Sequence, residues 1–136
     1  MEAFRHFITH ARSSVKSQAA LKICMGNVSV DMDSVVGSLI LAYYYNLKLK
    51  EVYIPVINCK RSFFPIKLDI NMQLTNHKVP EMIFFDDDIN QAGTIEKVQE
   101  VALIDHNKLD ITQDALLNTR VRRIVDHHID NNLYSG

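Results

Sequence analysis

Hydrophobic residues in this chain gather in five short runs, at residues 21–26, 52–57, 82–85, 100–104 and 121–125. Apolar runs of this length predict strands that are buried on both faces, as in a parallel sheet. Pro55 interrupts the second run. Because proline cannot donate a ladder hydrogen bond, it predicts an edge position or a strand end there.

Stretches with helical periodicity separate these runs. The first covers residues 2 to about 18, and others are expected from about 33 to 47, 67 to 76, 89 to 97 and 112 to 119. Asp33 or Ser34 is placed to cap the second helix. The alternation predicts an α/β fold of three layers, in which helices cover both faces of a mostly parallel five-stranded sheet.

Length and composition limit the possible classes of protein. A chain of 136 residues with 47% hydrophobic and 23% charged residues fits one globular domain. We assign residues 1–20 to an N-terminal helix and residues 21–136 to the domain that follows it. The formal net charge of −1 gives no reason to expect a nucleic acid or a membrane as a partner.

Cys24 and Cys59 both lie in apolar runs. Two such cysteines predict buried free thiols in a reducing compartment. The N-terminus lacks the apolar stretch of a signal peptide, and no segment approaches the length needed to span a membrane. We therefore expect a cytoplasmic location.

Acidic residues and histidines follow three of the five apolar runs. The segments are Asn27-Val-Ser-Val-Asp31-Met-Asp33-Ser34, Asp105-His106-Asn107 and Asp126-His127-His128. Because the carboxyl ends of parallel strands open into one crevice, these side chains are expected to converge. Carboxylates and imidazoles together suit divalent metal ions, so a metal-dependent hydrolase is the leading interpretation.

Asp31 and Asp33 are two positions apart in an extended turn, so both carboxylates can face that crevice. Two adjacent carboxylates repel each other unless a cation lies between them. The alternative is ordinary chemistry at a helix start, with one acid as the cap and the other solvated. The Asp-His pairs at 105 and 126 favour a metal site, because turns after buried strands do not require histidine.

The three segments together resemble those of the DHH phosphoesterase superfamily. Gly26-Asn27 and the segment Pro55-Val-Ile-Asn-Cys-Lys60-Arg61 resemble its exopolyphosphatase and prune branch, whereas the related manganese-dependent pyrophosphatases have His at the position of Asn27. The resemblance extends from about residue 21 to the C-terminus. It implies a DHH-type domain that binds divalent cations, Mg²⁺ or Mn²⁺, in a two-metal site.

Carried over residue by residue, the resemblance implies a catalytic group made of His128, Asp105 and Asn27. Asp105 would bridge the two cations, and His128 would contact the scissile phosphate. With Asn27 in place of His, the first site becomes richer in oxygen, which favours Mg²⁺ or Mn²⁺ over softer metals. The implied metal ligands are Asp31, Asp33, Asp105 and His127.

Lys60 and Arg61 follow the second run and are the expected binding residues for a phosphate chain, together with His128. Arginine forms bidentate hydrogen bonds with phosphate oxygens. The alternative is a solvated basic turn, which is the commoner role of such a pair.

Three further features have simpler explanations. The acidic run at residues 86–88 is expected to cap a helix that begins at Ile89. His6 and His10 are four apart on the first helix, with no third ligand near in sequence. The three tyrosines at 43–45 form a helix face that packs against the sheet.

The resemblance also implies a further Asp ligand from a later strand and a second, smaller domain that closes over the site. Neither is found after His128, so we expect residues 21–136 to be an incomplete DHH domain with a weakened second metal site. An open site leaves substrate exposed to water, where electrostatic stabilisation is weaker, and this predicts weak activity.

Two functions of different classes follow. The first is a metal-dependent phosphohydrolase that cleaves phosphoanhydride bonds in a small or polymeric phosphate, with the terminal phosphate of inorganic polyphosphate as the favoured target. The alternative is a catalytically silent domain that binds metal, nucleotide or a protein partner at the same crevice. An inorganic pyrophosphatase or a nucleotide phosphodiesterase is a second alternative.

Overall fold

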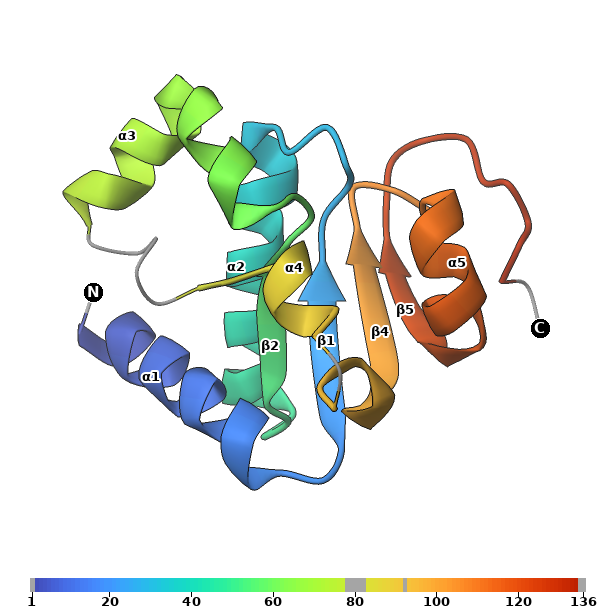
Figure 1. The fold of residues 1–136 in the computed structure, drawn as a ribbon, viewed down its shortest axis with the longest axis horizontal. Coiled ribbons are helices and arrows are strands. Elements are labelled where there is room, and N and C mark those ends of the chain that lie inside the picture. The colour runs from blue at the N-terminus through green and yellow to red at the C-terminus, as the bar shows by residue number, and fades with distance from the viewer. Residues whose placement is uncertain (1, 78–82, 92, 135–136) are drawn as a thin grey trace.

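The computed structural model describes residues 2–77, 83–91 and 93–134. Its five strands form one sheet in the order β3-β2-β1-β4-β5 (Figure 1). Every neighbouring pair is parallel, which confirms the expected α/β fold. The strands are β1 Leu21–Met25, β2 Tyr53–Ile57, β3 Phe84–Phe85, β4 Val98–Ile104 and β5 Val121–Val125.

Helices lie on both faces of the sheet. In Figure 1, α2 lies behind the strands, and α4 and α5 lie in front of them, so the three layers of the predicted fold are present. The α-helices are α1 Glu2–Ser17, α2 Met32–Lys48, α3 Leu68–Asn76, α4 Asp86–Ile89 and α5 Ile111–Leu117. Short 3-10 helices span Arg61–Ile66 (η1), Ile95–Lys97 (η2) and Asn118–Arg120 (η3).

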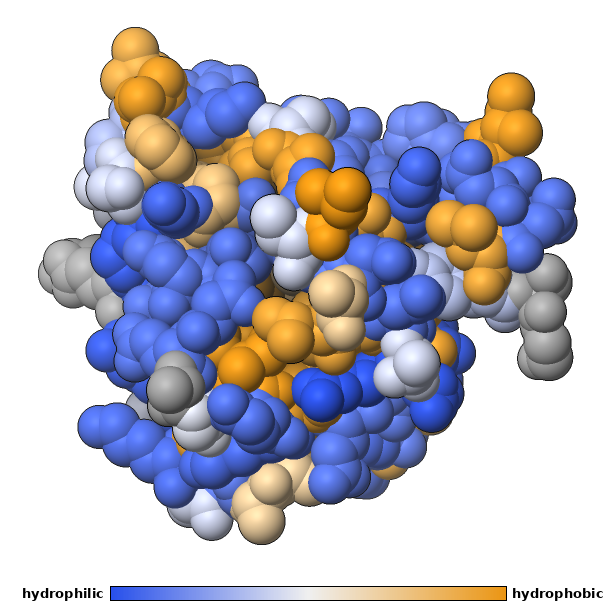
Figure 2. All heavy atoms as spheres, turned by 45° about the vertical axis from the view of Figure 1, so that its right-hand side comes forward, coloured by the Kyte–Doolittle hydropathy of each residue, from blue (hydrophilic) through white to orange (hydrophobic). Residues whose placement is uncertain are grey.

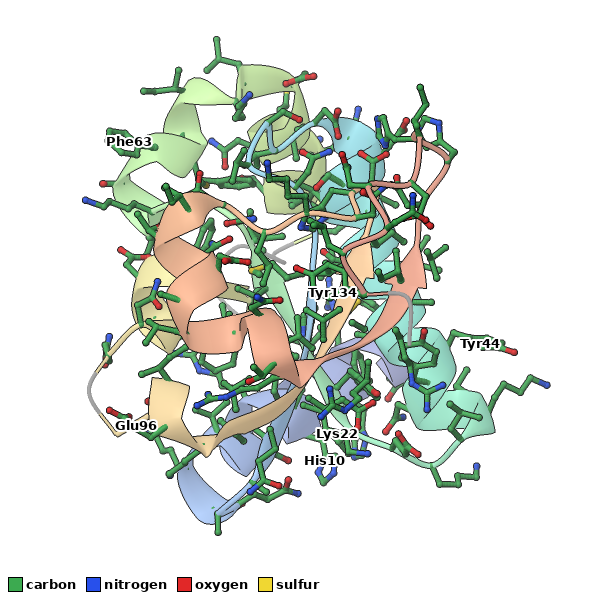
Figure 3. All side chains as sticks on the ribbon, turned by 90° about the vertical axis from the view of Figure 1, so that its right-hand side faces the viewer. His10, Lys22, Tyr44, Phe63, Glu96 and Tyr134 are labelled. Atoms are coloured by element: carbon green, nitrogen blue, oxygen red, sulfur yellow. The ribbon has the colours of Figure 1, made fainter. Side chains whose placement is uncertain are left out.

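Aromatic side chains join the helices behind the sheet to its strands. The ring of Tyr45 lies 4.7 Å from that of Tyr53 in β2, and Tyr43 contacts Phe4 of α1 at 5.5 Å. Tyr44 is about half exposed and extends away from the body of the molecule (Figure 3). Tyr45 therefore packs against the sheet as expected, whereas Tyr43 packs against α1, which shares the core of the domain through Phe4 and its buried neighbours.

The second helix begins two or three residues earlier than the sequence suggested. Asp31, rather than Asp33 or Ser34, is the N-cap of α2, because its backbone is extended and its carboxylate accepts a hydrogen bond from Ser34 N at 3.0 Å. The helix expected at 89–97 is also wrong. Gly93 has φ +85°, which an α-helix cannot accommodate, and only α4 and η2 flank it.

Pro55 lies inside β2, which is flanked by β1 and β3 and is therefore not an edge strand. Within the described ranges, β3 pairs with Val56 and Ile57 and not with Pro55, so no described residue of β3 requires a hydrogen bond from the missing N–H of Pro55. Met82, the first residue of the expected third strand, lies outside the described residues.

Two glycines allow α2 to lie very close to the sheet. A Cβ added to Gly26 would be 2.0 Å from Ser34 Oγ, and one added to Gly37 would be 2.9 Å from Ile104 Cδ1. The start of α2 is therefore in contact with the carboxyl ends of β1 and β4. This approach places the first acidic motif beside the residues that follow β4.

Most of the face shown in Figure 2 is hydrophilic, with an apolar area near its centre. No helix within the described ranges is long and apolar enough to cross a membrane. Cys24 is a buried free thiol, as expected, whereas Cys59 is free but only half-buried.

Candidate metal and phosphate site

Asp105 follows β4 and is the centre of the site. Its φ is +61°, a left-handed conformation that is uncommon outside glycine, and its backbone N–H donates to Val125 O at 2.9 Å. Nearby Val30 also has a positive φ, of 52°, which is rarer still for a β-branched residue. Backbone conformations of this kind cluster at functional sites, where the surrounding structure holds them in place.

The Asp105 carboxylate joins the three sequence motifs. Its Oδ1 lies 3.0 Å from His127 Nε2, and its Oδ2 accepts a hydrogen bond from Asn27 Nδ2 at 2.7 Å. The same Asn27 amide also donates to Asp105 O at 3.1 Å. Only 9% of the Asp105 side chain is exposed, compared with 76% of that of His127, so a buried carboxylate is presented to an open surface.

Asp126 orients the second histidine of its motif. Its Oδ1 lies 2.6 Å from His128 Nδ1, and its Oδ2 accepts from Asn107 Nδ2 at 2.6 Å. The rings of His127 and His128 lie 4.3 Å apart. Potential ligand atoms of Asp105, His127 and His128 lie within 4.8 Å of one another, close enough to share one divalent cation.

Electrostatic effects differ among the titratable groups of the site. The hydrogen bond with Asp126, helped by the charges of Asp105 and Asp31, raises the pKa of His128. Burial lowers the pKa of His106, whose Nδ1 contacts Ile104 O at 2.9 Å while its Nε2 is buried without a partner. At neutral pH, His128 therefore carries a proton more readily than His106 does.

The two acids of the first motif occupy different positions. Asp31 caps α2, and its negative charge is one of the causes that raise the pKa of His128, so Asp31 lies near the site. Asp33 lines a cavity of about 290 Å³ together with Asp105 and His127. All three motifs therefore meet at one edge of the sheet, and the individual metal-binding roles of Asp31 and Asp33 stay predictions.

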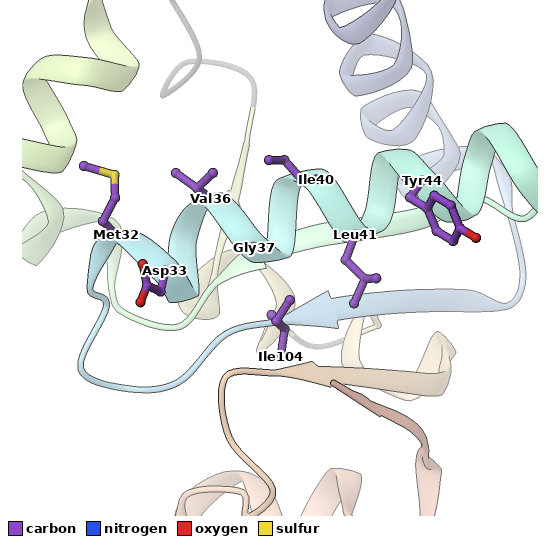
Figure 4. Close-up of a pocket in the computed structure, with 8 residues that line it drawn as sticks. All are labelled: Met32, Asp33, Val36, Gly37, Ile40, Leu41, Tyr44 and Ile104. Atoms are coloured by element: carbon purple, nitrogen blue, oxygen red, sulfur yellow. The ribbon is translucent and has the colours of Figure 1, made fainter. Parts of the chain in front are cut away.

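A long apolar groove adjoins this cavity. It has a volume of about 510 Å³ and runs along α2, past residues that include Ile40 and Tyr44 (Figure 4). Asp33 and Ile104 line both the groove and the cavity. The acidic side of the site is thus continuous with an uncovered apolar surface.

Arg61 is held by the acidic run that precedes Ile89. Its Nη2 lies 2.7 Å from Asp88 Oδ2, and its guanidinium carbon lies 4.4 Å above the ring of Phe85. Asp88 also accepts from Phe85 N at 2.8 Å, and the acids form the first turn of α4 rather than preceding a helix at Ile89. Lys60 is exposed. Phosphate binding by Lys60 and Arg61 stays a prediction.

Several residues near the site had no assigned role in the sequence analysis. Asn107 donates to Asp126 and to Ile129 O, and its Oδ1 accepts from Asn131 N at 3.2 Å, so it ties down the loop after β5. Lys67 Nζ donates to Ser29 O at 2.6 Å. The only sequence signal for Asn107 was its place in the Asp105-His106-Asn107 motif, and Lys67 had none because the contact spans 38 residues.

A parallel sheet with three acidic segments at its carboxyl edge, two of which carry histidines, is the arrangement expected of a DHH-type domain. No family model matches the chain. It is 33% identical over 129 residues to "Exopolyphosphatase PRUNE1" of Homo sapiens, a match that covers 89% of this chain and 27% of the human protein. The mouse protein of the same name is 32% identical over the same shares.

A more distant relative is the "Putative exopolyphosphatase" of Schizosaccharomyces pombe. It is 28% identical over 132 residues, which cover 95% of this chain and 34% of the yeast protein. The chain thus spans about a third or less of the length of the curated relatives it matches. It is a DHH/prune-type domain that corresponds to part of those longer proteins.

Proposed function

We propose that this domain is a metal-dependent phosphohydrolase that cleaves phosphoanhydride bonds, with the terminal phosphate of inorganic polyphosphate as the favoured target. The single observation that carries the proposal is the meeting of three motifs on the Asp105 carboxylate, which contacts both His127 and Asn27. The names of the relatives support the same class of reaction.

The donor set fits a divalent cation. Carboxylate oxygens and imidazole nitrogens are ligands for Mn²⁺ and related ions, and carboxylates also suit Mg²⁺. The ligand atoms of Asp105 and His127 lie 3.0 Å apart, and Asp33 lines the adjoining cavity, so these residues would hold the cation and His128 would remain for the substrate. When bound, a divalent cation supplies an acidified water and neutralises charge on the transferring phosphoryl group.

The protein's own residues prepare this chemistry. Asn27 fixes the Asp105 carboxylate, so its oxygens need little rearrangement when a cation is bound. Asp126 holds the Nδ1 side of His128, which leaves the Nε2 side of the ring for a substrate oxygen. A proton on His128 Nε2 stabilises the negative charge that develops on the departing phosphate.

The experiment is phosphate release from long-chain polyphosphate and from pyrophosphate, with Mg²⁺ or Mn²⁺, by the chain and by Asp105→Asn. Release that Asp105→Asn abolishes is the expected result, and the preferred substrate separates an exopolyphosphatase from a pyrophosphatase. Glu2→Gln, in the exposed first turn of α1, makes the same change of charge away from the site and is the matched control.

Absence of release by a chain that still binds Mn²⁺ in calorimetry would favour the silent binding domain instead. That alternative has support in the open setting of the site, where the His127 side chain is 76% exposed. A phosphodiesterase would be recognised by release from a nucleotide diester and not from polyphosphate.

A further inference from the structure

The two sides of Asp105 differ in chemistry. On one side, the cavity of about 290 Å³ is lined by the carboxylates of Asp33, Asp105 and Asp126, by His127 and by two aliphatic side chains. None of the described residues that line it is a lysine or an arginine. A cation is stabilised in such a cavity, and an extended polyanion is repelled.

On the other side, a second cavity of about 300 Å³ has a lysine among its lining residues. Its lining shares Asp105 and Asp126 with the first cavity, but Lys108 and the polar side chains of Asn27, Ser29, His128 and Asn131 take the place of Asp33. Amide and hydroxyl groups can donate hydrogen bonds to phosphate oxygens, and an ammonium group adds a positive charge. This cavity opens from the same Asp105 and His128 that belong to the metal group.

A second lysine lies at the rim of this cavity. Lys67 Nζ is 2.6 Å from the carbonyl oxygen of Ser29, which belongs to the cavity wall. One lysine therefore comes from the segment before α3 and the other from the loop after β4. By contrast, the guanidinium of Arg61 is engaged by Asp88 and stacked on Phe85.

We propose that a linear phosphate chain leaves the metal group past His128 and continues through the second cavity, where Lys108 and Lys67 bind the phosphates behind the one that is cleaved. This inference rests on the proposed function. It adds a binding subsite for the second and third phosphates and separates the cation side of Asp105 from the anion side. On this proposal, inorganic phosphate occupies only the cleaved position and does not need Lys108.

The test is calorimetric titration of the full chain, in Mg²⁺, with inorganic phosphate and with imido-bridged triphosphate, which resists hydrolysis. We expect Lys108→Ala to weaken triphosphate binding roughly tenfold, because one charge-assisted contact is lost. It should leave the affinities for inorganic phosphate and for Mn²⁺ unchanged. Lys67→Ala should act in the same direction but less strongly, because Lys67 lies at the rim.

Three controls make the result specific. Lys108→Arg keeps the charge and should restore most of the affinity. Lys48→Ala, in the last turn of α2 at the far end of the sheet, removes an exposed lysine without touching the site. The salt dependence of triphosphate binding should be smaller in Lys108→Ala, since one charge fewer is screened.

The outcomes separate this inference from the proposed function. If Lys108→Ala binds triphosphate as the parent does, the subsite is overturned while phosphohydrolysis stands. If the parent protein releases no phosphate and binds no triphosphate, both fail. If binding of an imido-bridged nucleoside triphosphate depends on Lys108 as strongly, the same path is supported, and the bound phosphate chain can belong to a nucleotide.

Discussion

Two charged clusters lie at opposite ends of the sheet, and they differ in how their acidic side chains are neutralised. At the amino ends of the strands, Lys22 and Arg123 pair with Glu51 and Glu100, so two bases match two acids. Lys22 lies at the lower end of the molecule in Figure 3. At the carboxyl ends, Asp105 lies against His127 and Asp126 against His128, while Asp31 and Asp33 add two further acids nearby.

The charges of the cluster at the amino ends neutralise one another without a bound ligand. Glu100 accepts a hydrogen bond from Tyr53 Oη and lies within 3.3 Å of Lys22 and 3.5 Å of Arg123. Arg123 also lies over the ring of Tyr45. Charges that neutralise one another in this way hold strands together, whereas carboxylates that lack cations create a demand for a ligand. The difference explains why only one of the two clusters is a candidate site.

The largest contrast is expected from Asp105→Asn. It should weaken Mn²⁺ binding by more than about 100-fold, because even removal of a residue behind a ligand costs 10- to 100-fold. The melting temperature of the metal-free protein should be unchanged or higher, since a buried negative charge is removed and Asn tolerates a positive φ. Calorimetry and thermal unfolding in a chelator measure the two effects. A lower melting temperature would contradict a site built for a ligand.

Gly26→Ala tests how the backbone positions the site end. The new methyl group would lie 2.0 Å from Ser34 Oγ and 2.6 Å from Ser34 O, so α2 must move away from β1. We expect a loss of about 3 kcal/mol in the free energy of unfolding, measured with urea. Gly93→Ala is a useful comparison, because no atom lies within 4 Å of its added Cβ and only the positive φ opposes the change.

Glu100→Gln should break the balance at the opposite end. The side chain of Glu100 is only 20% exposed, and its loss leaves Lys22 and Arg123 partly without their partner. Urea unfolding should show a loss of about 1–2 kcal/mol. Metal binding should remain as in the parent protein. A change in Mn²⁺ affinity would show that the two ends are coupled.

The parent protein and Glu100→Gln should also differ in how their stability depends on pH. Burial acts to raise the pKa of Glu100, but the hydrogen bond from Tyr53 and the charges of Lys22 and Arg123 lower it overall from the usual 4.5. An acid with a depressed pKa stabilises the fold above 4.5, and this contribution is lost as the pH falls through the folded-state value. Between pH 7 and about pH 3, the free energy of unfolding should fall less steeply in Glu100→Gln than in the parent protein.

Glu51→Gln is expected to have the smallest effect. Glu51 belongs to the same paired cluster, but its side chain is 32% exposed and its ion pair with Arg123 is 3.8 Å long. Partly exposed ion pairs contribute below about 1 kcal/mol, and less at high salt. Urea unfolding in low and high salt measures this. An effect equal to that of Glu100→Gln would mean that burial does not rank the two acids.

The amino-acid sequence by itself determined the order of strands and helices and the presence of three chemical motifs after three strands. These follow from local pattern: apolar runs, helical periodicity, and polar residues that begin where a run ends. The limits of that reasoning are visible at Gly93 and at Asp31. The pattern predicts a helix where the left-handed Gly93 interrupts it, and it places the cap of α2 two or three residues late.

The tertiary structure decided which of the charged residues meet. Asn27 contacts Asp105 across 78 positions, and Lys67 contacts Ser29 across 38, because strand order and crossovers bring distant loops to one edge of the sheet. The same folding brought Arg61 against Asp88 and matched Glu100 with Lys22. A sequence specifies local conformation through nearby residues, whereas charge balance depends on distances in space, which only the packed fold provides.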